Sequence, residues 1–181
     1  MMNFFVSKDC NPFWVALSGG GKLVGILAGS SETVFENHEF YRLVTYGYFH
    51  PAVWHLLANI LDLWYIEGIL EKEIGWLQFI LVYHVGLVVA GILFLAIFPN
   101  EWVFGASPAI FACIGMVTNR IYRNRVLLEE YKSQKGFNYL LYYFVLSNFI
   151  GISTLLIHFL GFVTGFLLAF FVKDKNGKEE F

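Results

Sequence analysis

Four polar side chains interrupt apolar stretches of the sequence: His55, Asn59, Ser107 and His158. A serine hydroxyl is a weak nucleophile until a neighbouring base accepts its proton, and histidine is a common base for that task. Side-chain donors such as those of Asn59 and His55 can stabilise the oxyanion of an acyl-transfer intermediate. These residue types therefore predict acyl transfer by a serine and a histidine, provided that the fold brings them together.

The composition indicates where such chemistry would take place. The chain has 181 residues, of which 57% are apolar and 14% charged, and its mean hydropathy is +0.60. A soluble domain carries about 25% charged residues, and a disordered chain is poor in aromatics. With 12 Lys and Arg against 14 Asp and Glu, a nucleic-acid binder is disfavoured. Two cysteines support neither a disulfide framework nor a cysteine zinc site. The composition therefore indicates a small multi-spanning membrane protein, the one class that these observations do not disfavour.

The apolar runs predict five membrane spans. The run 79–98 carries no formal charge and is long enough to cross a bilayer core of about 30 Å. The run 137–172 is too long for one crossing and must form two helices, with a turn in the polar stretch 147–153. The stretches 52–70 and 102–119 supply the other two spans.

The glycine-rich stretch 13–29 contains Lys22 and favours a loop or a partly inserted segment over a full span. Basic residues gather between 120 and 135 and again after 172, while the connections on the opposite side have none. The positive-inside rule places these basic ends in the cytoplasm. The spans that begin near residues 52, 102 and 154 then run from outside to inside. Their first turns carry His55, Asn59, Ser107 and His158, which we therefore expect at a similar depth in the outer part of the bilayer.

Two glycines follow His158 on its own helical face. Gly161 and Gly165 have the small-xxx-small spacing that lets a neighbouring helix approach closely. We therefore expect the last helix to touch the helix of Ser107, which would bring the serine and the histidine within hydrogen-bond reach.

Short motifs in a fixed order give the sequence a family resemblance. From about Glu39 to the C-terminus the chain resembles a rhomboid intramembrane serine protease. The resemblance rests on Tyr41-Arg42, His50, His55-x-x-x-Asn59, Glu71-x-x-x-Gly75-x-x-x-Phe79, Gly105-x-Ser107 and His158-x-x-Gly161-x-x-x-Gly165.

The resemblance implies a six-helix membrane core and a Ser–His dyad without a third carboxylate. It makes Ser107 the nucleophile and His158 the base. The oxyanion hole would comprise His55, Asn59 and the Ser107 backbone N–H, and the supporting residues would be Gly105, Gly161, Gly165 and His50. The substrates would be transmembrane or membrane-anchored proteins cut near the bilayer surface.

This chain departs from the family pattern in two places. Pro108 follows the serine where the family usually has glycine. Proline is tolerated in the first turn of a helix, but its ring would fill space beside the dyad. The chain also lacks a clear first helix ahead of Tyr41-Arg42, so a five-span core is one reading.

We accordingly expect an all-α, polytopic helical bundle of the rhomboid type. Its parts are an N-terminal segment and outer loop (1–38), a membrane core (39–173) and a cytoplasmic tail (174–181). We expect a multi-pass protein of the plasma (cell) membrane with transmembrane protein substrates, the lipid bilayer around it, no nucleic-acid partner, and neither cofactor nor metal.

Two other functions remain open at this point. A catalytically inactive rhomboid-like protein would bind transmembrane clients without cutting them, and a transporter or haem carrier would use its histidines as ligands. His84 is expected to be a structural hydrogen-bonder. Tyr139, Tyr142 and Tyr143 are expected to form an interfacial aromatic belt. The intramembrane carboxylate of Asp62 has no place in the family pattern.

Overall fold

The computed structural model describes residues 21–133, 136–149, 151–173 and 175. Almost all of the regular structure within these ranges is helical, which confirms the predicted all-α class. The helices are α2 (Gly21–Leu27), α3 (Arg42–Thr45), α4 (Val53–Ile74), α5 (Trp76–Ile97), α6 (Ser107–Arg123), α7 (Val126–Lys132), α8 (Phe137–Leu146) and α9 (Ile152–Leu168). The shorter elements are η1 (Glu32–Glu36), η2 (Tyr46–Tyr48), η3 (Ser147–Phe149), and the strands β1 (Gly29–Ser30) and β2 (Trp102–Val103).

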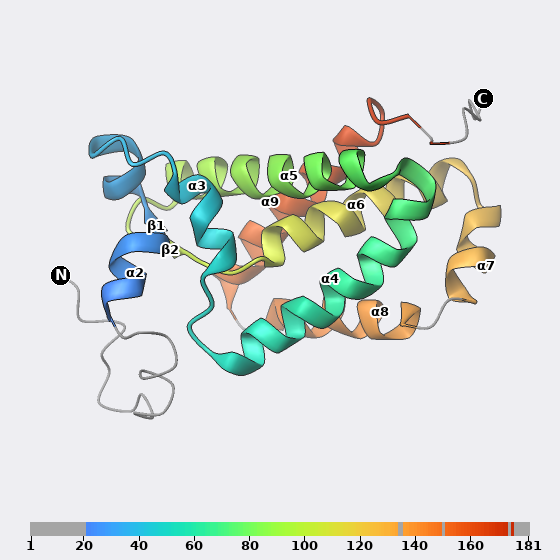
Figure 1. Ribbon diagram of the computed structural model, residues 1–181, viewed down its shortest axis with the longest axis horizontal. Coiled ribbons are helices and arrows are strands. Elements are labelled where there is room, and N and C mark those ends of the chain that lie inside the picture. The colour runs from blue at the N-terminus through green and yellow to red at the C-terminus, as the bar shows by residue number, and fades with distance from the viewer. Residues whose placement is uncertain (1–20, 134–135, 150, 174, 176–181) are drawn as a thin grey trace.

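Helix α6 lies at the centre of the bundle and packs against both α5 and α9, which also contact each other (Figure 1). A Cβ atom built on Gly86 of α5 would lie only 2.2 Å from the Cβ of Ala112 on α6. From the other side, a Cβ atom on Gly165 of α9 would lie 1.7 Å from the Ala112 carbonyl oxygen. Both glycines therefore allow backbones to meet that any side chain would hold apart, as expected for small-residue helix packing.

The long apolar run after residue 136 forms two helices, as predicted. Helix α8 ends in the turn η3, and α9 begins at Ile152. The Ser147 hydroxyl donates to the carbonyl of Tyr143 at 2.6 Å, and the Asn148 amide donates to the carbonyl of Phe144. Both side chains thus bond back to carbonyls of the last turn of α8, where the Tyr143 carbonyl also accepts from the backbone N–H of Ser147.

The predicted span 102–119 begins differently from the prediction. Trp102 and Val103 form strand β2, and the helix starts only at Ser107. Gly105 between them has φ +92°, a left-handed conformation that glycine adopts without strain. Pro108 lies in the first turn of α6, where its missing N–H costs no hydrogen bond.

Part of the glycine-rich N-terminal stretch is more ordered than the sequence suggested. Residues 13–20 lie outside the described residues, but Gly21–Leu27 is helix α2 where a loop was favoured. Strand β1 then pairs antiparallel with β2, with Gly29 opposite Val103. The buried guanidinium of Arg42 donates to the carbonyls of Gly25 and Ala28 at 2.6 and 2.7 Å and pairs with Glu39. Strand β1 is thus paired with β2, the strand that precedes α6, and Arg42 holds the end of α2.

Membrane crossing is supported to different degrees by the individual helices. Among the described residues, α5 alone is both long and apolar enough to cross a bilayer, and α9 is apolar but shorter. The ten residues of α8 reach about 15 Å, half the thickness of a bilayer core. The count of five crossings therefore stays a prediction.

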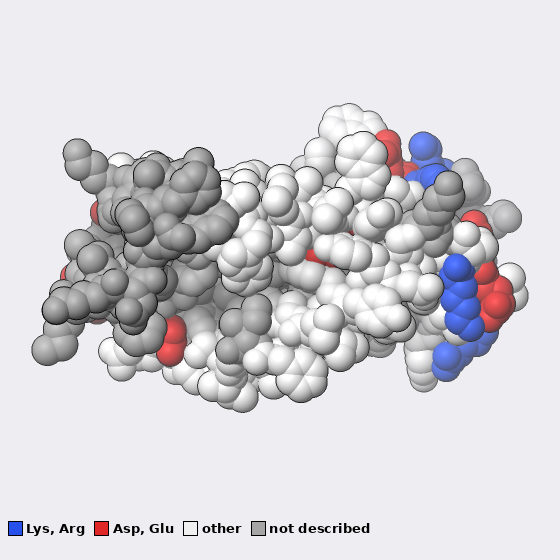
Figure 2. Space-filling view, turned by 90° about the horizontal axis from the view of Figure 1, so that it is seen from below, with Lys and Arg blue, Asp and Glu red and all other residues white. Residues whose placement is uncertain are grey.

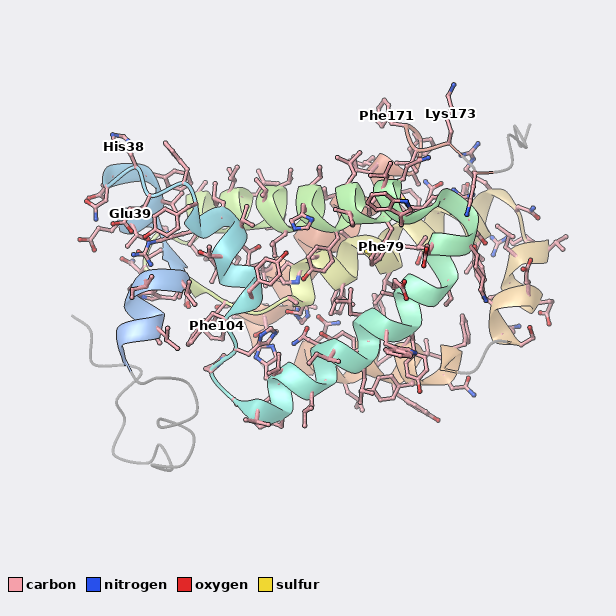
Figure 3. The ribbon with its side chains drawn as sticks, viewed as in Figure 1. His38, Glu39, Phe79, Phe104, Phe171 and Lys173 are labelled. Atoms are coloured by element: carbon pink, nitrogen blue, oxygen red, sulfur yellow. The ribbon has the colours of Figure 1, made fainter. Side chains whose placement is uncertain are left out.

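Charge is distributed unevenly along the molecule. In the view of Figure 2, Lys and Arg gather at one end, and the middle of the molecule is largely uncharged. The basic residues of α6 and α7, Arg120, Arg123 and Lys132, belong to that end. In Figure 3, His38 and Glu39 lie at the opposite end from Lys173. This arrangement is the one that the positive-inside rule anticipates.

Candidate active site

A cavity of about 900 Å³ contains three of the residues singled out from the sequence. His55 of α4, Ser107 of α6 and His158 of α9 all contribute to its wall. Residues 55, 107 and 158 are far apart along the chain, so the helix packing alone brings them together. The aromatic residues of the wall are Trp54, Phe94, Trp102, Phe104, Tyr139 and Tyr143.

Ser107 is held by the segment that precedes α4. The backbone N–H of Gly105 donates to the Tyr46 carbonyl at 2.8 Å, and that of Ala106 donates to His50 Nε2 at 3.2 Å. Ser107 follows directly as the first residue of α6. The first N–H groups of a helix have no intrahelical partner, so the Ser107 N–H can donate to a bound oxyanion.

The predicted supporting residues Gly105 and His50 both lie at this connection. A Cβ atom on Gly105 would lie 2.7 Å from Cε1 of His55 and 3.0 Å from its Nε2, so only glycine leaves room for that ring. Burial lowers the pKa of His50, which keeps its imidazole neutral, as acceptance from Ala106 requires. The His50 ring contacts His55 edge to face, with 4.9 Å between centroids. Figure 3 shows Phe104 on the same connection.

His158 is almost completely buried, with 2% of its surface exposed. Its ring stacks on that of Phe111, one helical turn beyond Ser107, with 4.1 Å between centroids and 12° between planes. Its Nδ1 lies 3.0 Å from Oδ1 of Asn148. The position of the imidazole is therefore defined both by ring stacking and by a polar contact.

Gly161 and Gly165 allow α9 to approach α6 as closely as predicted. A Cβ atom on Gly161 would lie 2.2 Å from the carbonyl oxygen of Pro108. Gly161 is one turn beyond His158, and Pro108 directly follows Ser107, so this close backbone contact lies beside both the serine and the histidine.

Pro108 affects the site less than its ring suggested. Its backbone carbonyl and Cα, rather than the ring, face Gly161. Pro108 is buried but does not belong to the cavity wall. The Pro108 ring thus takes no part in the cavity wall, and the proline fits the first turn of α6.

Asn59 differs from its predicted arrangement. Its side-chain nitrogen donates to the His55 carbonyl one turn earlier at 2.8 Å, and its oxygen accepts from the Tyr143 hydroxyl at 3.1 Å. Asn59 is buried and does not belong to the cavity wall. The structure brings His55, Ser107 and His158 into one cavity, but it leaves the Asn59 amide engaged elsewhere.

Three further residues lie near Ser107 or His158, and the sequence motifs do not include them. Phe111 stacks on His158, Asn148 contacts the same imidazole, and Tyr143 lies in the cavity wall and bonds to Asn59. The sequence predicts an interfacial aromatic belt for Tyr143, and the structure places it in the cavity wall. The spacing of Phe111, four residues after Ser107, was the one available signal, since residues four apart share a helical face.

Two polar residues within the helices have different surroundings. His84 is a structural hydrogen-bonder, as expected: its Nε2 lies 2.9 Å from the Tyr48 hydroxyl and its Nδ1 2.9 Å from the Ile80 carbonyl. Asp62 is fully buried, and neither carboxylate oxygen has a hydrogen-bond partner in the described part of the chain. Within the same ranges, no three His, Cys, Asp or Glu side chains gather as metal ligands would.

A serine and two histidines from three different helices thus surround one cavity of a helical bundle. Residues 37–175 match the family model of the Rhomboid domain. The chain is also 32% identical over 143 residues to the putative rhomboid protease YdcA of Bacillus subtilis (strain 168), covering 77% of this chain and 71% of that protein. The chain belongs to the rhomboid family, as the sequence motifs indicated.

More distant relatives have longer chains. RHOMBOID-like protein 1 of Arabidopsis thaliana is 30% identical over 143 residues, which cover 76% of this chain and 36% of that protein. Rhomboid-like protease 3 of Toxoplasma gondii is 29% identical over 90 residues, covering 50% of this chain and 34% of that protein. This chain thus spans about a third of the length of each of these two relatives.

Proposed function

We propose that this chain is an intramembrane serine endopeptidase that cleaves transmembrane or membrane-anchored proteins through a Ser107–His158 dyad. The observation that carries the proposal is the shared cavity: Ser107, His158 and His55 line it together, and Ser107 stands at the beginning of α6. Membership of the rhomboid family supports a protease, and two relatives carry the word protease in their names.

In the first half of the reaction, Ser107 Oγ attacks the carbonyl carbon of the scissile bond while His158 takes the hydroxyl proton. The C–O bond that forms gives a tetrahedral intermediate with one negatively charged oxygen. His158 then returns the proton to the leaving nitrogen, the C–N bond breaks, and the N-terminal part of the substrate remains as an ester on Ser107.

In the second half, a water molecule takes the place of the leaving amine. His158 accepts a proton from the water, the resulting hydroxide attacks the ester carbonyl, and a second tetrahedral intermediate forms. The proton passes from His158 back to Ser107 Oγ as the C–O bond to the serine breaks. The carboxylic acid product leaves, and both residues recover their starting state.

In both halves of the reaction, hydrogen-bond donors beside Ser107 must stabilise the negatively charged oxygen of the tetrahedral intermediate. We assign this role to the Ser107 N–H and the imidazole of His55, since Gly105 allows the His55 ring to lie against the residues that lead into α6. We assign Asn59 a lesser part than the sequence suggested, because one of its N–H groups already bonds to the His55 carbonyl. Preorganised donors of this kind are worth several kcal/mol of transition-state stabilisation.

We infer where the reaction takes place from the membership of the rhomboid family. We propose a multi-pass protein whose membrane core extends over residues 39–173, with the 1–38 segment outside and 174–181 as a cytoplasmic tail. The aromatic cavity wall suits an apolar peptide segment that arrives from the bilayer. The basic end with Arg123 and Lys132 would face the cytoplasm.

The experiment is cleavage of a transmembrane reporter by the purified protein in lipid vesicles. Ser107→Ala and His158→Ala should each abolish cleavage, and the double variant should be no worse than either single one, since residues that act as one unit are strongly non-additive. Independent, multiplicative losses would contradict the dyad. A wild-type protein that binds the reporter and never cuts it would be an inactive rhomboid-like binder.

A further inference from the structure

Asn148 lies where the chain turns from α8 into α9, in the short helix η3. Its side chain reaches two groups. The amide nitrogen donates to the carbonyl of Phe144, and Oδ1 lies 3.0 Å from Nδ1 of His158. The residue therefore connects the end of α8 directly to the imidazole that the proposed reaction uses as its base.

The chemistry of these contacts fixes which way the amide points. A backbone carbonyl can only accept a hydrogen bond, so the group of Asn148 that faces Phe144 must be the NH₂. The oxygen at the other end of the amide is then the atom that faces His158. An oxygen without a proton can only accept, so the facing nitrogen of His158 must carry the hydrogen.

This assignment determines the tautomer of the imidazole. A neutral histidine has one N–H, and if it is on Nδ1, the lone pair is on Nε2. The stack on Phe111, at 4.1 Å and 12°, holds the plane of the ring, and the 3.0 Å contact between Nδ1 and Asn148 Oδ1 fixes which edge of the ring faces Asn148. Nε2 is the nitrogen left to accept the proton of Ser107.

We propose that Asn148 is a positioning residue of the active site, which holds His158 in the Nδ1–H tautomer with Nε2 free as the base. This proposal rests on the proposed function of Ser107 and His158. Serine and cysteine proteases use an aspartate or an asparagine for this task, and the wrong tautomer at such a site abolishes most of the base's contribution. Here the residue is a neutral amide, which stabilises the imidazolium by its dipole and not by a full negative charge.

The direct test reads the tautomer and does not require activity. NMR of isotope-labelled imidazole nitrogens distinguishes Nδ1–H from Nε2–H, and His158→Gln identifies the signal of His158. The wild type should show Nδ1–H, and Asn148→Leu should lose that preference. An Nε2–H tautomer in the wild type, or an unchanged Nδ1–H tautomer in Asn148→Leu, would overturn the proposal even if Ser107 proves to be the nucleophile.

Reporter cleavage adds a functional readout. Asn148→Leu should lower kcat at least about tenfold, a part of the roughly 10²–10⁴-fold that a general base contributes, with KM little changed. Asn148→Asp keeps an acceptor towards Nδ1 and should restore most of the lost rate. Equal losses of kcat in both variants, with intact thermal unfolding, would contradict a positioning role.

Ser147→Ala provides the matched structural control. Its hydroxyl caps the Tyr143 carbonyl at 2.6 Å in the same turn, and its hydrogen bond does not involve His158. This variant should leave the His158 tautomer unchanged. If Ser147→Ala disturbs the tautomer as much as Asn148→Leu does, the effect belongs to the turn and not to the Asn148 amide, and the proposal fails.

Discussion

The carbonyl oxygen of Pro108 lies so close to Gly161 that a Cβ atom on the glycine would be 2.2 Å away. The two helices therefore meet backbone to backbone directly after Ser107 and one turn beyond His158. This contact is the close approach of α9 to α6 that lies nearest in sequence to both Ser107 and His158, so we expect it to influence how far apart the proposed nucleophile and base lie.

Gly161→Ala should separate α9 from α6. The added methyl group has a rigid backbone atom in its way, and overpacking of this kind typically costs about 1–3 kcal/mol. We expect a lower midpoint of thermal unfolding and a loss of reporter cleavage larger than the loss of stability alone explains.

Gly68→Ala on α4 is the control, because nothing lies within 4 Å of a Cβ atom there. Alanine at an open helix position is more stable than glycine by about 0.5–1 kcal/mol. If Gly161→Ala is as stable and active as Gly68→Ala, the close helix contact does not position the dyad.

Asn59→Ala should reduce cleavage much less than the roughly 10²–10³-fold loss that follows removal of a dominant oxyanion donor. The reason is that Asn59 bonds to the His55 carbonyl and to Tyr143 instead of facing the cavity. Steady-state kcat of Asn59→Ala and His55→Phe gives the comparison. A loss at Asn59 equal to or larger than that at His55 would show that the amide turns into the site during the reaction.

Asp62→Leu should stabilise the protein. The carboxylate is fully buried without a hydrogen-bond partner among the described residues, and a buried unsatisfied polar group costs about 1–3 kcal/mol. Thermal unfolding in detergent micelles measures the change, and Asp62→Asn, which keeps a polar group, should gain less. A lower unfolding midpoint for Asp62→Leu would mean that the carboxylate has a stabilising partner. If Asp62→Leu is more stable but cleaves the reporter more slowly, the Asp62 carboxyl group has a role in function.

Acidification should destabilise the fold through His50. Burial lowers the pKa of His50 from its ordinary value of 6.5, so the unfolded chain binds the proton more readily than the folded one. The contribution of His50 to stability is complete above pH 6.5 and declines as the pH falls below that value. Protonation of Nε2 would also break its bond from the Ala106 N–H.

The measurement is thermal unfolding at about pH 7.5 and about pH 5.5, for wild type and His50→Gln. Glutamine retains an acceptor for Ala106 but does not titrate, so the variant should lose less stability on acidification. The other histidines are common to both proteins and cancel in the comparison. Parallel losses in the two proteins would place the acid sensitivity elsewhere.

Uncharged apolar runs and turn residues predicted the main helices. The orientation from the basic residues, together with the spacing of Gly161 and Gly165, predicted that His55, Ser107 and His158 come together, and the three residues do line one cavity. Gly105 and Pro108 mark the start of α6, although strand pairing shortened that helix from its predicted beginning at Trp102. Helix α2 was missed because glycine lowers helix propensity, while Arg42 stabilises the end of that helix from elsewhere in the chain.

The directions of individual side chains could not be predicted from the spacing of residues in the sequence. His55 and Asn59 do occupy one helical face, as their separation predicts, but the Asn59 amide turns back to the His55 carbonyl, a local bond that asparagine readily forms. The contact of Asn148 with His158 depends on how tightly the chain turns between α8 and α9, and nothing in the spacing of the two residues specifies that geometry.

Covalent labelling by a fluorophosphonate probe tests the central claim most directly, because only an activated serine reacts with it. The account predicts that the wild type is labelled, that peptide mapping finds the adduct on Ser107, and that both Ser107→Ala and His158→Ala remain unlabelled while folded. A folded wild-type protein that does not react, or an adduct on any residue other than Ser107, would contradict it.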